Sequence, residues 1–376
     1  MSAFQDYFTE MLKNPPDPNE PKPLSNRHAT MYGATLPFHI LAWVAVLFRL
    51  WTRYRVVRDP GWDDHIIVLC SVFNLVSMVG FIGSIYTGLG EHILYVGEGR
   101  LVTMMKWLYL NSAAYYMCAG LVKLSLLAQY LRLFKTGALR KICLVLLVVT
   151  SIWTLFWAVQ GWLPCFPVDG FWNRQQTPAP RCWGTGFANK TSVLVFLYAF
   201  AASNMVLDTM IFAIPMVVYL RPGISQKEVV ALGSLFTLGS VVVLMSILRL
   251  WTTVKHKYND PFSMDFTWWY PLPLTIACIE IDFAIICASI PIFWPVIISS
   301  LPQIFVTQEV RVTHHQRIDD FEMDRPNSLK SNNSQVGLTR VAQKTNYRDQ
   351  FVVDHVTGKQ NTEVLVETEP DHKWYR

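Results

Sequence analysis

Seven long apolar runs are the feature of this 376-residue chain that most constrains its fold. Each is close to the length of about 20 residues that an α-helix needs to cross a bilayer. Stretches such as Ile66-Ile-Val-Leu-Cys-Ser-Val-Phe also lack the polar stripe of a helix on the surface of a soluble protein. The runs cover about residues 32–48, 66–86, 107–131, 142–163, 191–220, 229–248 and 272–299.

The composition supports a membrane protein, because 52% of the residues are hydrophobic and only 16% are charged. The net charge of +5 lies in short clusters between the runs, which indicates residues that flank a membrane and not a surface for nucleic acid. The first run is the shortest, and we expect Arg49 and Trp51 to extend it by reaching toward the headgroups. The prediction is an all-α membrane protein, a seven-transmembrane-helix bundle in contact with the lipid bilayer.

The orientation follows from the connections between the runs. The first connection carries Arg53, Arg55 and Arg58, and the third and fifth are also short and basic, whereas the others dilute their basic residues with acidic ones. Basic short loops mark the cytoplasmic side, so the N-terminus is expected outside. We predict a short polar extracellular N-terminus (1–31), a membrane domain (32–300) and a disordered cytoplasmic tail (301–376).

Several short motifs follow one another through the membrane domain. They are Phe48-Arg-Leu-Trp-Thr-Arg-Tyr-Arg, Gly61-Trp-Asp-Asp-His, Gly88-Leu-Gly-Glu-His-Ile, Leu121-Val-Lys-Leu-Ser-Leu-Leu-Ala-Gln-Tyr-Leu-Arg-Leu-Phe, Cys165-Phe-Pro-Val-Asp-Gly-Phe-Trp-Asn, Asn204-Met-Val-Leu-Asp, Arg249-Leu and Ile285-Ile-Cys-Ala-Ser-Ile-Pro. In this order and spacing they resemble the fungal rhodopsin-domain family of seven-span proteins. That family is related to pathogenicity-associated GPCR-like receptors and to membrane proteins of mycotoxin gene clusters.

The resemblance implies a receptor-like sensor of an unknown small-molecule or lipid ligand, in the plasma membrane rather than an endomembrane. A G protein or another cytoplasmic signalling protein is the candidate partner. The alternative is a transporter or membrane accessory protein of fungal secondary-metabolite biosynthesis. Retinal is not expected as a cofactor, because residues 272–299 contain no lysine to form a Schiff base. No catalytic motif or metal-ligand spacing stands out, so an enzyme is not expected.

Ionisable residues within the runs are the candidate functional residues, because a charge inside a membrane is costly. Lys123 and Asp208 lie about 12 and 18 Å from the cytoplasmic ends of their helices at roughly 1.5 Å per residue, close enough to pair. Alternatively, Lys123 extends to the headgroups and Asp208 bonds Asn204 one turn away. Glu280 and Asp282 lie on opposite sides of one helix, and the resemblance implies that Glu280 faces the interior.

A motif at the cytoplasmic end comprises Trp62, Asp63 and Asp64 with Arg132. Acidic residues at a helix start satisfy its free N–H groups, so capping is the simpler interpretation and docking of a cytoplasmic partner is the alternative. Arg132 is expected to anchor the third run at the membrane surface.

The fourth connection holds the remaining candidates. Cys165 and Cys182 both fall there, on the side expected to face an oxidising compartment, so we predict a structural disulfide between them. Asn189 begins an Asn-Lys-Thr glycosylation sequon beside the fifth run.

Overall fold

The computed structural model describes residues 12–13, 15–173, 178–186, 190–219, 226–255 and 265–304. The chain divides into two units, Met1–Pro295 and Val296–Arg376. The arrangement described here is that of the first unit. Apart from the end of the last helix, at 301–304, the predicted tail lies outside the described residues.

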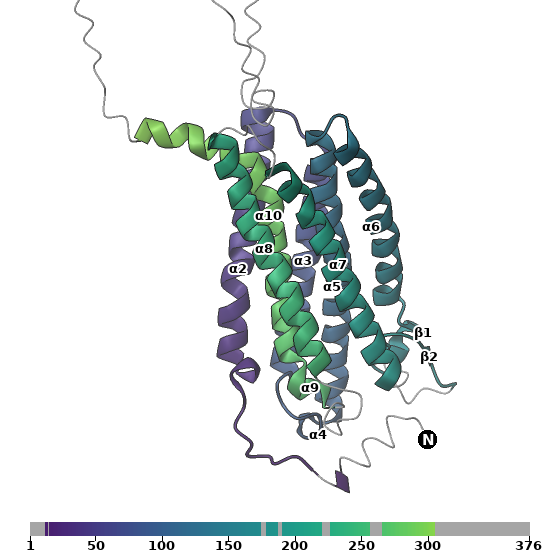
Figure 1. Ribbon diagram of the computed structural model, residues 1–376. Helices are drawn as coiled ribbons and strands as arrows, with labels where there is room; N and C mark the ends of the chain where they lie inside the picture. Colours follow the sequence, from purple (N-terminus) through teal and green to yellow (C-terminus); the bar gives the residue numbers. More distant parts are fainter. Residues whose placement is uncertain are drawn as a thin grey trace, which may run out of the picture. The chain divides into compact units, whose positions relative to one another are not determined.

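Seven long helices and several short elements make up the described part of the chain (Figure 1). In chain order they are η1 (Leu24–Asn26), α2 (His28–Trp51), η2 (Thr52–Val57), α3 (Trp62–Thr87), α4 (Ile93–Val96), α5 (Glu98–Leu133), α6 (Ala138–Trp162), β1 (Cys165–Phe166), η3 (Val168–Phe171), β2 (Arg181–Cys182), α7 (Lys190–Tyr219), α8 (Gln226–Lys255), α9 (Phe266–Trp269) and α10 (Pro271–Ile304). Each long helix covers one of the seven predicted runs, most of them with extra turns at one or both ends. Helix α6 ends one residue before its run does, and residue 220 of the fifth run lies outside the described residues.

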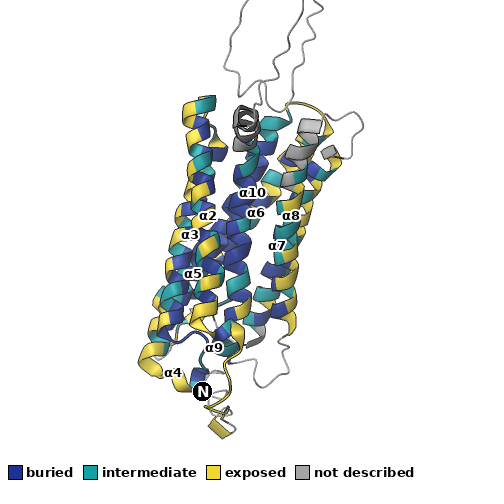
Figure 2. Cartoon of the chain, turned by 90° about the vertical axis from the view of Figure 1, so that its left-hand side faces the viewer, coloured by how far each residue is buried: buried dark blue, intermediate teal, exposed yellow. Residues whose placement is uncertain are grey.

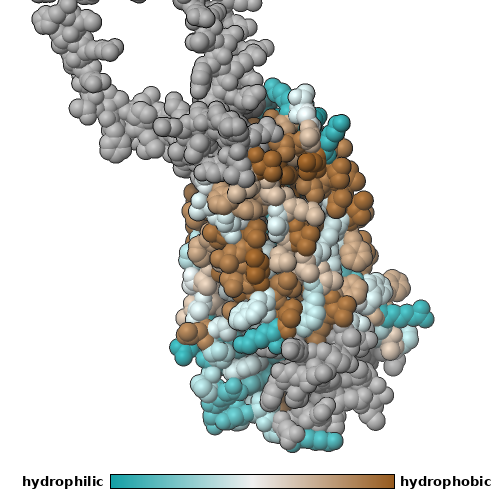
Figure 3. Space-filling model, viewed as in Figure 1, coloured by the Kyte–Doolittle hydropathy of each residue, from teal (hydrophilic) through white to brown (hydrophobic). Residues whose placement is uncertain are grey.

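Six of the long helices are apolar enough to cross a membrane. The qualifying segments are His28–Val57, Trp62–Thr87, Ala138–Trp162, Ser192–Val217, Phe236–Lys255 and Pro271–Ile292. Hydrophobic side chains cover much of the surface in view between two more hydrophilic ends (Figure 3). The protein is therefore an all-α membrane bundle.

Helix α5 is the least hydrophobic of the long helices, although it is the longest of those described. Its polar residues Asn111, Lys123 and Gln129 are all buried, because α5 packs against α3, α6 and α7. A helix among other helices can carry polar groups that a lipid-facing helix cannot. Figure 2 shows the contrast between buried residues inside the bundle and exposed residues on the outer face of α2.

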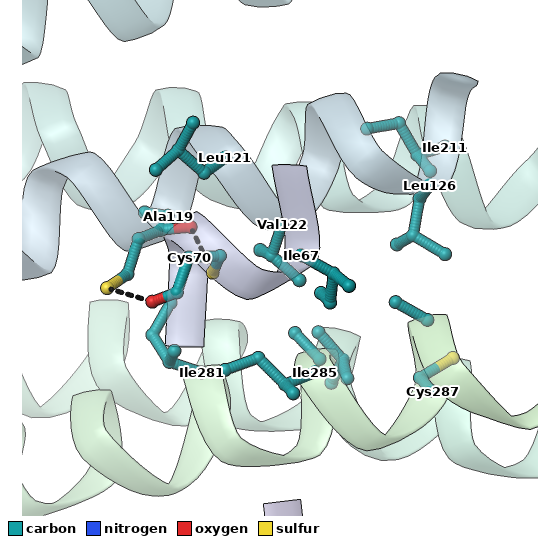
Figure 4. Close-up of a cluster of buried hydrophobic side chains, with 14 of the residues drawn as sticks. Ile67, Cys70, Ala119, Leu121, Val122, Leu126, Ile211, Ile281, Ile285 and Cys287 are labelled. Atoms are coloured by element: carbon teal, nitrogen blue, oxygen red, sulfur yellow. Dashed lines mark hydrogen bonds between the residues drawn. The ribbon is translucent and has the colours of Figure 1, made fainter. Parts of the chain in front are cut away.

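Helices α3 and α5 approach each other closely at small residues. A Cβ atom on Gly80 would lie 2.7 Å from the backbone nitrogen of Asn111, so only glycine fits there. Farther along, the Cys70 thiol donates to the carbonyl of Cys118 at 3.6 Å and the Cys118 thiol donates back at 3.4 Å (Figure 4). Around these cysteines lies an apolar core that includes Ile67 and Ile285.

The first helix differs from its prediction. Helix α2 begins at His28 and continues into the π-helical turn η2, which ends at Val57. Because this segment is longer than the predicted run, Arg49 lies well inside it, and its side chain is completely buried. The expectation that Arg49 reaches the headgroups is wrong, whereas the Trp51 side chain is half-exposed.

Candidate functional site

Five polar residues from four helices form one hydrogen-bonded chain, which we call the central polar network. Lys123 of α5 lies with its Nζ 2.8 Å from Oδ1 of Asp208 and 2.8 Å from Oδ1 of Asn204, both on α7. The Asn204 amide donates to Asp208 at 2.7 Å and to Glu280 of α10 at 2.8 Å. Glu280 also accepts from Nε of Arg249, on α8, at 2.8 Å.

The network is buried and electrically balanced. Its charged residues are between 2% and 9% exposed, and the two cations equal the two carboxylates in number. The Lys123 ammonium lies 5.6 Å from the ring centre of Trp153, and the Arg249 guanidinium lies 5.2 Å from that of Phe200. Aromatic faces next to desolvated cations add attraction. Each charge in the network thus has both an ionic partner and a polar or aromatic neighbour.

Lys123 and Asp208 were predicted to lie close enough to pair, and they form an ion pair in the structure. Asn204 bonds Asp208 as well. Lys123 does not extend to the headgroups. Glu280 faces the interior, as the resemblance implies. Arg249 was missed as a site residue because the predicted sixth run ended at residue 248, whereas α8 continues to Lys255.

Asp282 is the second buried carboxylate of α10, and it faces the opposite side. Its Oδ1 accepts from the amide of Asn74 on α3 at 2.8 Å and lies 3.2 Å from Nδ1 of His39 on α2. The indole of Trp43 contacts the other ring nitrogen of His39 at 3.2 Å. Oδ2 of Asp282 is buried without a hydrogen-bond partner among the described residues.

A second charged cluster lies where α2 ends and α3 begins, and we call it the Asp63 cluster. Arg49 donates to Asp63 at 2.6 Å, to Asp64 at 2.8 Å and to the carbonyl of Ala288 on α10 at 2.6 Å. Arg53 lies 3.4 Å from both carboxylates.

The rest of the cluster joins α3 to α5. Arg132 of α5 pairs with Asp59 and lies 3.4 Å from Asp63. Asp64 accepts from the Gly61 amide at 3.0 Å, which confirms its capping role. Both acidic residues of the motif are buried by their ion pairs, so neither offers a surface to a partner, whereas Trp62 is 82% exposed.

The opposite end of the bundle, which we call the disulfide end, is closed by loops. The structure joins Cys165 to Cys182, and β1 and β2 pair antiparallel with these two residues opposite each other. Nearby, Nδ1 of His92 lies 2.5 Å from Asp265, and the His92 ring stacks on Trp268 at 3.8 Å. These contacts hold the loop before α5 against the segment before α10.

Three small cavities lie beside or beyond the network. A polar cavity of about 30 Å³ is lined by Asn111, Tyr115 and Arg249, and an aromatic cavity of about 50 Å³ lies under the disulfide loop. The third, of about 40 Å³, is lined by Lys123 and Asp208. Burial raises the pKa of Tyr270, between the first two cavities, to about 12, so its hydroxyl keeps its proton.

Comparison with known families decides the classification, since the model of the fungal rhodopsin domain matches residues 48–299. The chain belongs to the fungal rhodopsin domain family. Every residue of the central polar network and of the Asp63 cluster lies within the matched region. No solved structure matches the chain.

Relatives of this fungal rhodopsin-domain protein carry names of two kinds. Receptor GIN3 of Arthrobotrys oligospora is 26% identical over 297 residues, which are 71% of this chain and 64% of that protein. The chain thus spans less than two thirds of that receptor's length. Wortmanamides biosynthesis cluster protein C of Talaromyces wortmannii is 22% identical, covering 72% of this chain and 71% of that protein. Polyenoic acids biosynthesis gene cluster protein Ba17b of Metarhizium anisopliae is 24% identical, over 53% and 54% of the two chains.

The remaining predicted sites stand as follows. Asn189 lies outside the described residues, so its glycosylation stays a prediction. Among the residues that the structure describes, no group of three or more His, Cys, Asp or Glu side chains is placed to hold a metal ion.

Proposed function

We propose that this fungal rhodopsin-domain protein is a receptor-like sensor and not an enzyme, with α5 as a seventh span. The N-terminus and the disulfide end face outside, and the tail faces the cytoplasm. The observation that carries the proposal is the central polar network. Ion pairs join α5 to α7 and α8 to α10, and the Asn204 amide links the two pairs. A ligand that disturbs one member therefore changes the environment of four helices.

The orientation is supported by the charges at the two ends. Arg55, Arg58 and Lys135 lie in short connections at the end of the Asp63 cluster, as expected for a cytoplasmic face. The disulfide between Cys165 and Cys182 lies at the other end, where an outside location provides oxidising conditions. The plasma membrane and a cytoplasmic signalling protein, such as a G protein, belong to this proposal.

A reporter active only in the cytosol tests the orientation. It should give signal when fused after Arg376 and none when fused before Met1. The reversed pattern would contradict the proposed orientation.

The alternative function is transport or an accessory role in secondary-metabolite biosynthesis. Two relatives are named as cluster proteins, and buried charges also mark the ion pathways of transporters. The receptor is favoured because the chain shows no internal repeat of the kind on which many transporters are built, and because one relative is named a receptor.

A gene-deletion strain separates the two functions. The strain receives either the wild type or the double variant Lys123→Met with Asp208→Leu, and both must reach the membrane in equal amounts. For a receptor, the double variant fails to restore the transcripts that the deletion alters, and secreted metabolites keep their ratio between mycelium and medium. For a transporter, metabolites accumulate in the mycelium with the double variant. Full restoration of transcripts by the double variant would contradict a signalling role for the network.

A further inference from the structure

The polar cavity and the aromatic cavity adjoin each other on the disulfide side of Arg249. Four residues line both of them: Ser112, Tyr116, Leu197 and Tyr270. The aromatic cavity is walled by rings that include Tyr109, Phe171 and Trp269. The two cavities therefore form one site with an aromatic outer part and a polar inner part.

The inner part contains polar atoms without partners. Oη of Tyr115 and Oδ1 of Asn111 are buried and make no hydrogen bond with any described residue. Arg249 also lines this cavity, is 5% exposed and bonds Glu280 through Nε and Nη2, which use two of the five N–H donors of its guanidinium. Buried polar groups are normally hydrogen-bonded. Unpartnered groups around one cavity indicate a place where a ligand or water completes them.

The chemistry of these atoms defines the ligand. The guanidinium of Arg249 has N–H donors beyond the two that bond Glu280 and suits an acceptor oxygen. Oδ1 of Asn111 is an acceptor and suits a hydroxyl or N–H group. The Tyr115 hydroxyl can serve either. The charges of the central polar network already cancel, so an anionic ligand would add an uncompensated buried charge.

We infer that this site binds a neutral, mostly aromatic molecule with a carbonyl and a neighbouring hydroxyl at one end. The carbonyl of the ligand accepts hydrogen bonds from Arg249 and Tyr115, and its hydroxyl donates to Asn111. Its rings pack in the aromatic cavity. The cavities now have room for water molecules only, so a ligand must displace the side chains of Tyr116 and Tyr270. This inference rests on the proposed receptor function and names the ligand class of that receptor.

A matched series of compounds tests the inference on the full chain in phosphatidylcholine nanodiscs, by titration calorimetry. Benzoin has two rings, a carbonyl and an adjacent hydroxyl; deoxybenzoin lacks the hydroxyl, bibenzyl lacks both groups, and benzilate carries a negative charge. We expect benzoin to bind about tenfold more tightly than deoxybenzoin, since one hydrogen bond is worth about that factor. Bibenzyl and benzilate should bind more weakly still.

Two variants test whether benzoin binds at this site. Tyr115→Phe removes a hydroxyl that has no partner, so folding is kept and the affinity for benzoin should fall about fivefold to tenfold. Leu197→Trp fills the junction of the two cavities and should abolish binding. Leu155→Trp, on the exposed face of α6, adds the same ring outside the site and should change nothing.

The outcomes separate this inference from the receptor function. Absence of benzoin binding, or equal binding of the four compounds unaffected by Tyr115→Phe and Leu197→Trp, overturns the inferred site. The receptor function would still stand if the deletion strain shows the signalling phenotype. Conversely, the expected binding order without any signalling phenotype supports the site and contradicts the receptor.

Discussion

The Asp63 cluster and the central polar network are both made of buried ion pairs, yet they join different parts of the bundle. The Asp63 cluster connects α2, α3 and α5 and reaches the backbone of α10. The central polar network connects α7 and α8 to α5 and α10. Close backbone contacts are extensive between α3 and α5 and between α7 and α8, but sparse between α7 and either α5 or α6.

The two parts of the bundle differ in whether backbone packing or side-chain contacts hold their helices together. The α3–α5 pair has both backbone packing and charges, because Gly80 and Cys70 of α3 allow α5 to come near, whereas close backbone contacts between α2 and α3 are few. The α7–α8 pair depends more on side chains, chiefly the network and the rings around Phe200. If one part of the bundle shifts during signalling, we expect it to be the α7–α8 pair.

The largest effect is expected at the Asp63 cluster. Arg49→Met leaves the buried carboxylates of Asp63 and Asp64 without their main partner, and breaking a buried pair costs about 3–5 kcal/mol. Folded protein, measured by size-exclusion chromatography of a fluorescent fusion, should be nearly lost. Arg55→Met, on an exposed neighbour, is the control and should fold normally. Normal folding of Arg49→Met would show that the Asp63 cluster does not stabilise this end of the bundle.

The next effect concerns the pair between Lys123 and Asp208. Lys123→Met or Asp208→Asn leaves an uncompensated charge and should cost about 3–5 kcal/mol. For Lys123→Met the loss should be smaller than for Arg49→Met, because Asn204 and Ser246 still bond Asp208. The double variant Lys123→Met with Asp208→Leu should regain most of the folded yield, since apolar replacement of a whole buried pair is tolerated. Double-variant yields no better than the single ones would show that the pair contributes more than mutual neutralisation.

The disulfide holds α7 in place in addition to the central polar network and the rings around Phe200, because the loop that contains it connects α6 to α7. Closing the 17-residue separation between Cys165 and Cys182 is worth about 3 kcal/mol in the chain-entropy model. Cys165→Ser and Cys182→Ser should each lower the thermal stability, and the double variant should be no worse than either. A free thiol at either position in the unreduced protein, detected by mass spectrometry, would contradict the pairing.

The smallest effect is expected at Asp282, where the partners are a neutral amide and an imidazole. An asparagine oxygen can accept the same hydrogen bonds from Asn74 and His39, so Asp282→Asn should cost about 1 kcal/mol. Glu280→Gln, two residues away, leaves Arg249 unpaired and should cost several times more. Thermal unfolding of both variants in one detergent measures the contrast. Equal losses would show that the charge of Asp282 matters as much to folding as that of Glu280.

Local hydropathy was enough to predict the helices and their order, because burial in lipid requires about 20 apolar residues in succession whatever the neighbours are. It was also enough to single out Lys123, Asp208 and Glu280, since a charge within such a run is rare. The same reasoning made Arg49 a headgroup anchor and left Arg249 just outside the sixth run, because an apolar run ends, by hydropathy, where an arginine follows.

What the sequence alone determined is the class of protein, the number of long helices and the candidate charges. The tertiary structure determined which charged side chains form ion pairs with each other. It brought Arg249 to Glu280 and Arg49 to Asp63 and Asp64, buried both faces of α10, and enclosed the unpartnered atoms of Tyr115 and Asn111 around one cavity. Hydropathy is a property of consecutive residues, whereas ion pairs between helices depend on rotation and register, which only the packing of all the helices determines.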